Sequence, residues 1–185
     1  MAHPYWSGQR SIGLLDLKGC FGLEVYNGAC EVDDVKGLSA VHWDDLLAAG
    51  RRWWGLAVDD SHWRNGSKDA GLGWVWVKAT TLTQEAILTA LAQGYFYASS
   101  GPLIHDLQFD MEQRRVYMRC SPAVAVDFVG NGPNSRRVMA PPGETLTEAS
   151  HKLRKRQRYV RVACQDAEGR QAWSNPIFFD SRRTE

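Results

Sequence analysis

The chain has 185 residues, a formal net charge of +1, 44% hydrophobic residues and 23% charged residues. This composition is ordinary for a globular protein, and the length suits one or two domains that each bury a core. A charge near zero supplies no overall field that would draw the chain to nucleic acid or to an anionic membrane, so neither partner is expected. The basic run 152–158 is better interpreted as a solvated strand or turn.

No run of about 18 apolar residues is present that would span a membrane, and the first residues lack the pattern of a secretory signal. The four cysteines, Cys20, Cys30, Cys120 and Cys164, form no C-x-x-C motif. We therefore expect a cytoplasmic protein with reduced thiols.

Up to about residue 100, short apolar strands alternate with helices. The strands are expected at 21–26, 54–58 and 73–79, and the helices at 39–50 and from the capping Thr83 to Gly94. Six of the eight tryptophans fall within 43–76, and we interpret this cluster mainly as core. The alternation predicts an α/β barrel or a layered sheet.

After Gly101-Pro102 the pattern changes to period two with frequent turns. This pattern is typical of a small antiparallel β-sandwich, so we predict one domain over 1–101 and a β-sandwich domain over 102–185. The expected strands are 104–111, 116–120, 124–129, 159–164 and 173–179.

The residues best suited to metal chemistry follow the strand 54–58. Asp60 and His62 lie two residues apart there, and ligands of α/β barrels gather at the carboxyl ends of strands. A carboxylate with an imidazole suits Zn, Mn or Fe. Taken alone, however, this D-x-H is better explained as a turn with a capping Asp and a surface His, and His3 alone as an exposed residue.

An ordered series of motifs favours the metal interpretation. The series resembles the C-terminal portion of metal-dependent phosphoesterases of the PHP (polymerase and histidinol phosphatase) superfamily, in the branch whose catalytic domain precedes a β-rich domain. It covers nearly the whole chain. The motifs are, in order, A-H-P-Y-W, G-L-E-V-Y-N-G, W-D-D-L-L-A-A-G-R, G-L-A-V-D-D-S-H-W, G-W-V-W-V-K-A, L-T-Q-E-A-I-L-T-A-L-A-Q-G-Y-F-Y-A-S-S-G-P and W-S-N-P-I-F.

The resemblance implies the fold, the activity and the site. It implies a partial PHP-type (β/α) barrel followed by the β-sandwich. Its activity would be hydrolysis of a small phosphorylated substrate by water activated on divalent metal ions. The metal ligands would be His3, Asp60 and His62.

Four further residues are candidates for orienting the ligands or lining the cleft. Glu24 and Asn27 lie near the site in such proteins, although a strand-end polar pair that satisfies backbone groups explains them equally well. Asp59, like the neighbouring Ser61, has the same two interpretations. Lys78 is a candidate for contacting a phosphate, although a solvated strand-end lysine is the better explanation. Arg64 and Lys68 in the loop 64–72 are candidates for contacting an anionic substrate, although a flexible, solvated loop explains them better.

Family members carry an H-x-H motif and further ligands before the H-P motif, whereas only Met1 and Ala2 precede His3 here. We therefore expect an incomplete site in this chain. A barrel without its first strands also has an open edge, which predicts self-association or pairing with a missing N-terminal half. The alternative is a non-catalytic remnant that acts as a binding or structural module.

Overall fold

The computed structural model describes residues 1–63 and 68–179. Within these residues four helices and twelve strands form a mixed α/β fold in which most strands are antiparallel. The helices are α1 (Ser11–Leu14), α2 (Gly28–Asp34), α3 (Ala40–Ala48) and α4 (Gln84–Gln93). The strands are β1 (Gly22–Asn27), β2 (Trp54–Val58), β3 (Trp74–Val77), β4 (Phe96–Ser99), β5 (Ile104–Asp110), β6 (Arg115–Ala123), β7 (Ala125–Gly130), β8 (Arg136–Met139), β9 (Leu146–Lys152), β10 (Tyr159–Gln165), β11 (Gln171–Ser174) and β12 (Ile177–Phe178).

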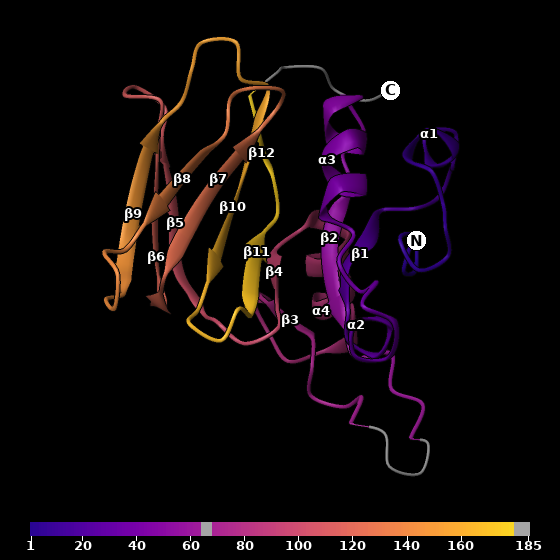
Figure 1. The fold of residues 1–185 in the computed structure, drawn as a ribbon. Coiled ribbons are helices and arrows are strands. Elements are labelled where there is room, and N and C mark those ends of the chain that lie inside the picture. The colour runs from indigo at the N-terminus through magenta and orange to yellow at the C-terminus, as the bar shows by residue number, and fades with distance from the viewer. Residues whose placement is uncertain (64–67, 180–185) are drawn as a thin grey trace.

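The elements stack in three layers (Figure 1). The central sheet has the order β3-β4-β11-β10-β7-β8, with β12 paired to β10. The outer sheet, β5-β6-β9, covers one of its faces, and the parallel pair of β1 and β2 lies on the other face together with α3. The two antiparallel sheets make a β-sandwich, as the period-two pattern predicts.

Strand β10 shows why the central sheet needs cover on both faces. Alternate side chains point to opposite faces of a strand. Tyr159 and Ala163 pack into a core with the parallel pair and α3, whereas Val160 and Val162 pack into the sandwich core against β6 and β7. Arg161 shares the first face, where its guanidinium pairs with Asp44 of α3 at 2.7 Å.

The predicted (β/α) barrel is not present as a closed structure in the part of the chain that is described. There, β1 and β2 form the one parallel pair, and no barrel closes. The strand expected at 73–79 is present as β3, but it does not extend the parallel pair. Strand β3 pairs antiparallel with β4, and β4 in turn pairs with β11.

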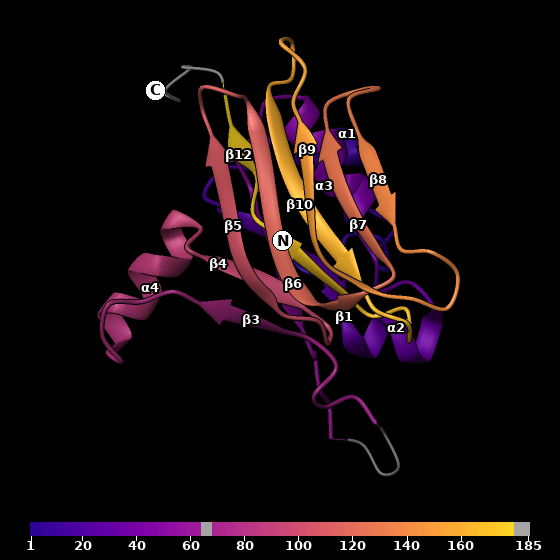
Figure 2. The same ribbon diagram turned by 90° about the vertical axis from the view of Figure 1, so that its left-hand side faces the viewer.

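Hydrogen bonds join the residues before residue 101 to the residues after it. Pairing of β4 with β11 joins residues before and after the predicted boundary in one sheet. Asn175 strengthens this connection: its side chain accepts a hydrogen bond from the backbone N–H of Gly55 and donates to the carbonyls of Gly94 and Phe96, each at 3.0 Å. In Figure 2, β3 and α4 project beyond the sandwich, while β4 leads back into it. The division at 101 stays a prediction.

The edge of β1 that faces away from β2 carries backbone partners. The Glu24 N–H donates to the Met1 carbonyl at 3.0 Å, and the Met1 amino group donates to the Gly22 carbonyl at 2.9 Å. Further along, the Ser39 N–H donates to the Val25 carbonyl at 2.9 Å, and the Asn27 N–H donates to the Gly37 carbonyl at 3.0 Å. These bonds occupy the edge at which the sequence predicts a missing neighbour. The predicted self-association and partner chain stay predictions.

Candidate functional site: an acidic pocket beyond the parallel strands

The carboxyl ends of β1 and β2 lie at the same edge because the two strands are parallel. Asn27, the last residue of β1, is level with Val58, the last residue of β2. The backbone of Met1 runs alongside β1 through the two hydrogen bonds described above. His3, Asn27 and Asp60 therefore emerge close together, as expected for side chains that follow neighbouring parallel strands.

A pocket of about 280 Å³, here called the acidic pocket, lies at this edge. It brings together the three metal ligands that the resemblance implies, which are far apart in the sequence. Its lining residues are His3, Trp6, Ala29, Cys30, Asp33, Asp34, Asp60, His62 and Asp69. A larger hollow of about 750 Å³ lies on the outer sheet, and none of the predicted site residues lines it.

Glu24 and Asn27 connect two of the candidate ligands beneath the pocket. One oxygen of Glu24 accepts hydrogen bonds from the His3 backbone N–H at 2.7 Å and from the Asn27 amide at 3.0 Å. The same amide nitrogen of Asn27 donates to Oδ2 of Asp60 at 3.1 Å. Asn27 is completely buried, so its amide is held in place. The pair therefore contacts the candidate ligands, and it also satisfies backbone groups.

His3 and Asp60 both have backbone conformations that residues other than glycine rarely adopt. Their φ angles are 25° and 54°, in the left-handed region. Such conformations cost of order 1 kcal/mol or more and persist where surrounding contacts impose them. Asparagine and aspartate tolerate this region better than most residues. The strain is thus placed on two of the three candidate ligands.

Asp59 has a different role from its neighbour. Its carboxylate accepts hydrogen bonds from the backbone N–H groups of Gly71, Leu72 and Gly73 at 2.6–2.8 Å. Burial is the largest single influence on this carboxyl and favours its neutral form, but the three N–H groups together outweigh it. The pKa of Asp59 therefore lies below its ordinary value. Asp59 holds the segment that leads into β3 and is not among the residues that line the pocket.

Asp69 is a member of the pocket that sequence reasoning missed. It is buried, and its carboxylate accepts the backbone N–H of His62 at 2.7 Å and the hydroxyl of Ser61 at 3.1 Å. It therefore fixes the turn that carries the D-x-H motif. No sequence signal distinguishes it from any other aspartate in a polar loop.

Cys30, Asp33 and Asp34 reach the pocket because the chain forms α2 directly after β1. Asn27 caps this helix, with its side-chain oxygen accepting the Cys30 N–H at 3.0 Å. Burial, and then the negative charges of Asp60, Glu24, Asp34 and Asp33, raises the pKa of the Cys30 thiol to about 11. Burial is the larger cause of this shift, and the four carboxylates that add to it make the surroundings of Cys30 negative, which favours cations over anions.

The donor types in the pocket suit a divalent metal ion, but their arrangement is incomplete. Imidazole and carboxylate groups are the ligands that Zn, Mn and Fe prefer. Nδ1 of His3, however, is hydrogen-bonded to the Ser7 hydroxyl at 2.8 Å. Among residues 1–63 and 68–179, no three His, Cys, Asp or Glu side chains are placed so that one ion could be held between them. The pocket thus matches a metal site in chemistry and not in converged geometry.

Of the candidate phosphate-binding residues, the two described lysines, Lys68 and Lys78, do not line the acidic pocket. Lys78 follows β3 and lines other hollows, beside Trp76, Tyr95 and α4. Lys68 is exposed, and Arg64 lies outside the described residues.

Comparisons with known protein families, with curated proteins and with solved structures found no match to this chain. Likewise, no helix among the described residues is both long and apolar enough to cross a membrane.

Proposed function

We propose that the acidic pocket binds a divalent metal ion, Zn, Mn or Fe, and that the protein takes part in metal-dependent hydrolysis of phosphate esters. One observation carries the proposal: His3, Asp60 and His62, which the PHP resemblance selects from separate parts of the sequence, line a single pocket. The parallel pair, with the Met1 backbone beside it, is what a portion of a PHP-type (β/α) barrel would contain.

The chain's own residues divide into ligands and supports. The imidazoles of His3 and His62 and the carboxylate of Asp60 would hold the ion. Asn27 orients Asp60 through a hydrogen bond of 3.1 Å, and Glu24 fixes the backbone of His3 at 2.7 Å. Contacts of this kind commonly set the orientation and affinity of metal ligands. A bound ion supplies a more acidic water and neutralises charge on the phosphate.

The surrounding charge also favours a cation. Asp33, Asp34 and Asp69 line the pocket with Asp60. Carboxylates attract a metal ion but repel a phosphate, so a phosphorylated substrate would approach only when the ion is bound. The proposal therefore predicts no affinity for phosphate esters in the absence of metal.

A second candidate function is a binding or structural module without catalysis. The observation that favours it is the lack of three converged metal donors among the residues described. If the site holds one ion weakly, or none, the β-sandwich would be the part of the chain that carries the binding or structural function. Metal binding without hydrolysis would favour this second candidate.

The test is a hydrolysis assay with p-nitrophenyl phosphate and bis-p-nitrophenyl phosphate across a range of Mn²⁺ and Zn²⁺ concentrations. Asp60→Asn is the sharpest variant, since asparagine tolerates the φ of 54° and can still accept the hydrogen bond of Asn27. We expect turnover that requires metal and falls about 10-fold or more in this variant. His105→Ala, which removes an exposed histidine of β5, serves as the matched control. Turnover that is equal in Asp60→Asn and the parent would refute the assignment.

A further inference from the structure

Two cysteines face each other in the sandwich core, on strands from different sheets. Cys120 follows Val116 and Met118 in the inward-facing row of β6, and Cys164 follows Val160 and Val162 in the inward-facing row of β10. The two residues are 2% and 1% exposed. Both thiols are reduced in this structure.

The two thiols lie close together. Both belong to the buried cluster of the sandwich core, although the two residues are distant in the sequence. Each thiol shifts the pKa of the other: contact with Cys164 lowers the pKa of Cys120, and contact with Cys120, together with burial, raises the pKa of Cys164.

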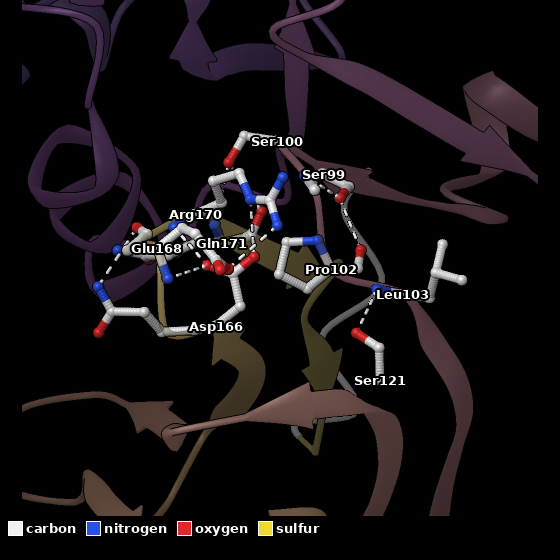
Figure 3. A network of polar contacts seen from close by, with 12 residues as sticks. Ser99, Ser100, Pro102, Leu103, Ser121, Asp166, Glu168, Arg170 and Gln171 are labelled. Atoms are coloured by element: carbon white, nitrogen blue, oxygen red, sulfur yellow. Dashed lines mark hydrogen bonds and ion pairs between the residues drawn. The ribbon is translucent and has the colours of Figure 1, made fainter. Parts of the chain in front are cut away.

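The strand ends that carry the two thiols are tied to the same short segment, Ser99–Leu103 (Figure 3). Leu103 and Ser121, the neighbour of Cys120, exchange hydrogen bonds of 2.9 and 3.0 Å. Ser100 and Gln171 likewise exchange hydrogen bonds of 2.8 and 2.9 Å, and Gln171 pairs with Gln165, the neighbour of Cys164. The segment thus connects the backbone beside Cys120 with the backbone beside Cys164.

The hairpin beside Cys164 is also rigid. Asp166 accepts the backbone N–H of Arg170 at 2.9 Å and its guanidinium at 2.8 Å, which closes the turn between β10 and β11. Figure 3 shows this cluster next to Ser100 and Pro102. These bonds hold the backbone that follows Cys164 in place.

We propose that Cys120 and Cys164 are a redox-sensitive pair that forms a disulfide between the central sheet and the outer sheet. Each thiol loses one hydrogen, one S–S bond forms, and two electrons pass to the oxidant. With a hydroperoxide such as hydrogen peroxide the products are the disulfide and two waters. With oxidised glutathione they are the disulfide and two reduced glutathione molecules.

Burial makes the pair slow to react and stable once joined. An oxidant reaches the sulfurs during folding or when the sandwich opens locally. The disulfide then links β6 to β10 across a long loop of chain, which restricts the unfolded state and raises the melting temperature. Cys20 and Cys30 differ, since Cys20 lies against the other core and Cys30 lines the acidic pocket.

The test compares full-length protein refolded with oxidised glutathione or treated with hydrogen peroxide against protein kept in dithiothreitol. We expect the oxidised sample to lose the mass of two hydrogen atoms and to yield one linked peptide pair, containing Cys120 and Cys164. Its melting temperature should rise by roughly 5–10 °C and return after reduction. Cys20→Ser is the matched control and should behave as the parent, whereas Cys120→Ser should show neither the link nor the shift.

Two results would overturn the proposal. One is full alkylation of Cys120 and Cys164 by maleimide in denaturant after either oxidant treatment. The other is a linked peptide pair that involves Cys20 or Cys30 instead. Both results come from the parent protein, so they hold even where Cys120→Ser fails to fold.

Discussion

At the residue scale, the polar side chains at the ends of the parallel strands have two different structural roles. Asn27 and Glu24 contact the candidate ligands, whereas Asp59 holds the backbone ahead of β3. The two adjacent aspartates of the D-D-S-H motif therefore point to different partners. The contacts of Asp59 lead to a stability prediction that depends on the charge of its carboxylate.

Replacing Asp59 with asparagine should destabilise the protein by about 1–3 kcal/mol near pH 7, because the amide accepts fewer of the three N–H groups. The pKa of Asp59 is lower in the folded state than the ordinary value of about 3.9. Its stabilisation is therefore complete above about pH 5 and is lost as the pH falls through the ordinary value toward the folded one. Urea unfolding of both proteins at several pH values measures this difference. A difference that stays constant, or grows as the pH falls, would contradict this role.

The sequence predicts the candidate ligands but not the contacts that support them. His3, Asp60 and His62 belong to motifs, so the resemblance selects them. Asp69 belongs to none, and its contact with His62 depends on how the chain returns after the loop. Lys78 illustrates the reverse case: a plausible residue type at a strand end lies beside other hollows because β3 joins the central sheet.

At the element scale, most strands and both longer helices follow the predicted pattern. The helix from Thr83 to Gly94 has the expected ends, with Thr83 accepting the Ala86 N–H at 3.3 Å and Gly94 in the left-handed region. The missed helix α2 begins at Asn27-Gly28, which is also a turn signal. Gly28 is needed there because a Cβ would meet the side chain of Leu72 at 2.5 Å. That constraint is a tertiary contact, and the local sequence does not contain it.

The sequence pattern misses β4, β8 and β9, and of these β8 and β9 are partly exposed. Strand β9 carries Thr147, Glu148 and Ser150, so the alternation that marks a half-buried strand is weak there. Their pairing with β7 and β6 is set by the neighbours and not by propensity. The predicted strand 173–179 divides into β11 and β12, because Asn175 turns its side chain to β2 and β4 between them.

Packing between elements predicts a large effect at Gly55 of β2. A Cβ there would meet three ring atoms of Trp43 at 2.5–2.9 Å, and the ring is fixed by its N–H bond to the Trp53 carbonyl at 2.8 Å. Gly55→Ala should therefore cost roughly 1–3 kcal/mol in the free energy of unfolding. Gly13→Ala in α1 is the control, since nothing lies within 4 Å of its added Cβ. Equal stabilities of the two variants in chemical denaturation would show that the Trp43 ring shifts easily to make room for the added Cβ, and would contradict the prediction.

At the scale of the whole molecule, the central sheet joins the two halves of the chain. Pairing of β4 with β11, the Arg161–Asp44 ion pair at 2.7 Å and the Asn175 contacts all cross residue 101. A closed barrel with an appended sandwich would instead separate at that point. The sequence pattern changes at residue 101, but pattern alone carries no information on which strands pair, and antiparallel pairing already begins with β3 and β4 before that residue.

This arrangement predicts that residues 1–101 and residues 102–185 unfold together in a single cooperative transition. Tryptophan fluorescence reports mainly on the first part, which contains all the tryptophans except Trp173, whereas far-ultraviolet circular dichroism follows the strands of the sandwich. The two denaturation curves should coincide. Two separated transitions would instead favour independent domains on either side of residue 101.

The central claim is that the acidic pocket binds a divalent metal ion through His3, Asp60 and His62. Its most direct test is equilibrium binding of Mn²⁺ and Zn²⁺ to the full chain by isothermal titration calorimetry, with the parent, Asp60→Asn and the control His105→Ala. The account predicts one ion per chain for the parent and for His105→Ala, and an affinity about 10-fold or more lower for Asp60→Asn. Absence of binding to the parent, or equal affinity in all three proteins, would contradict it.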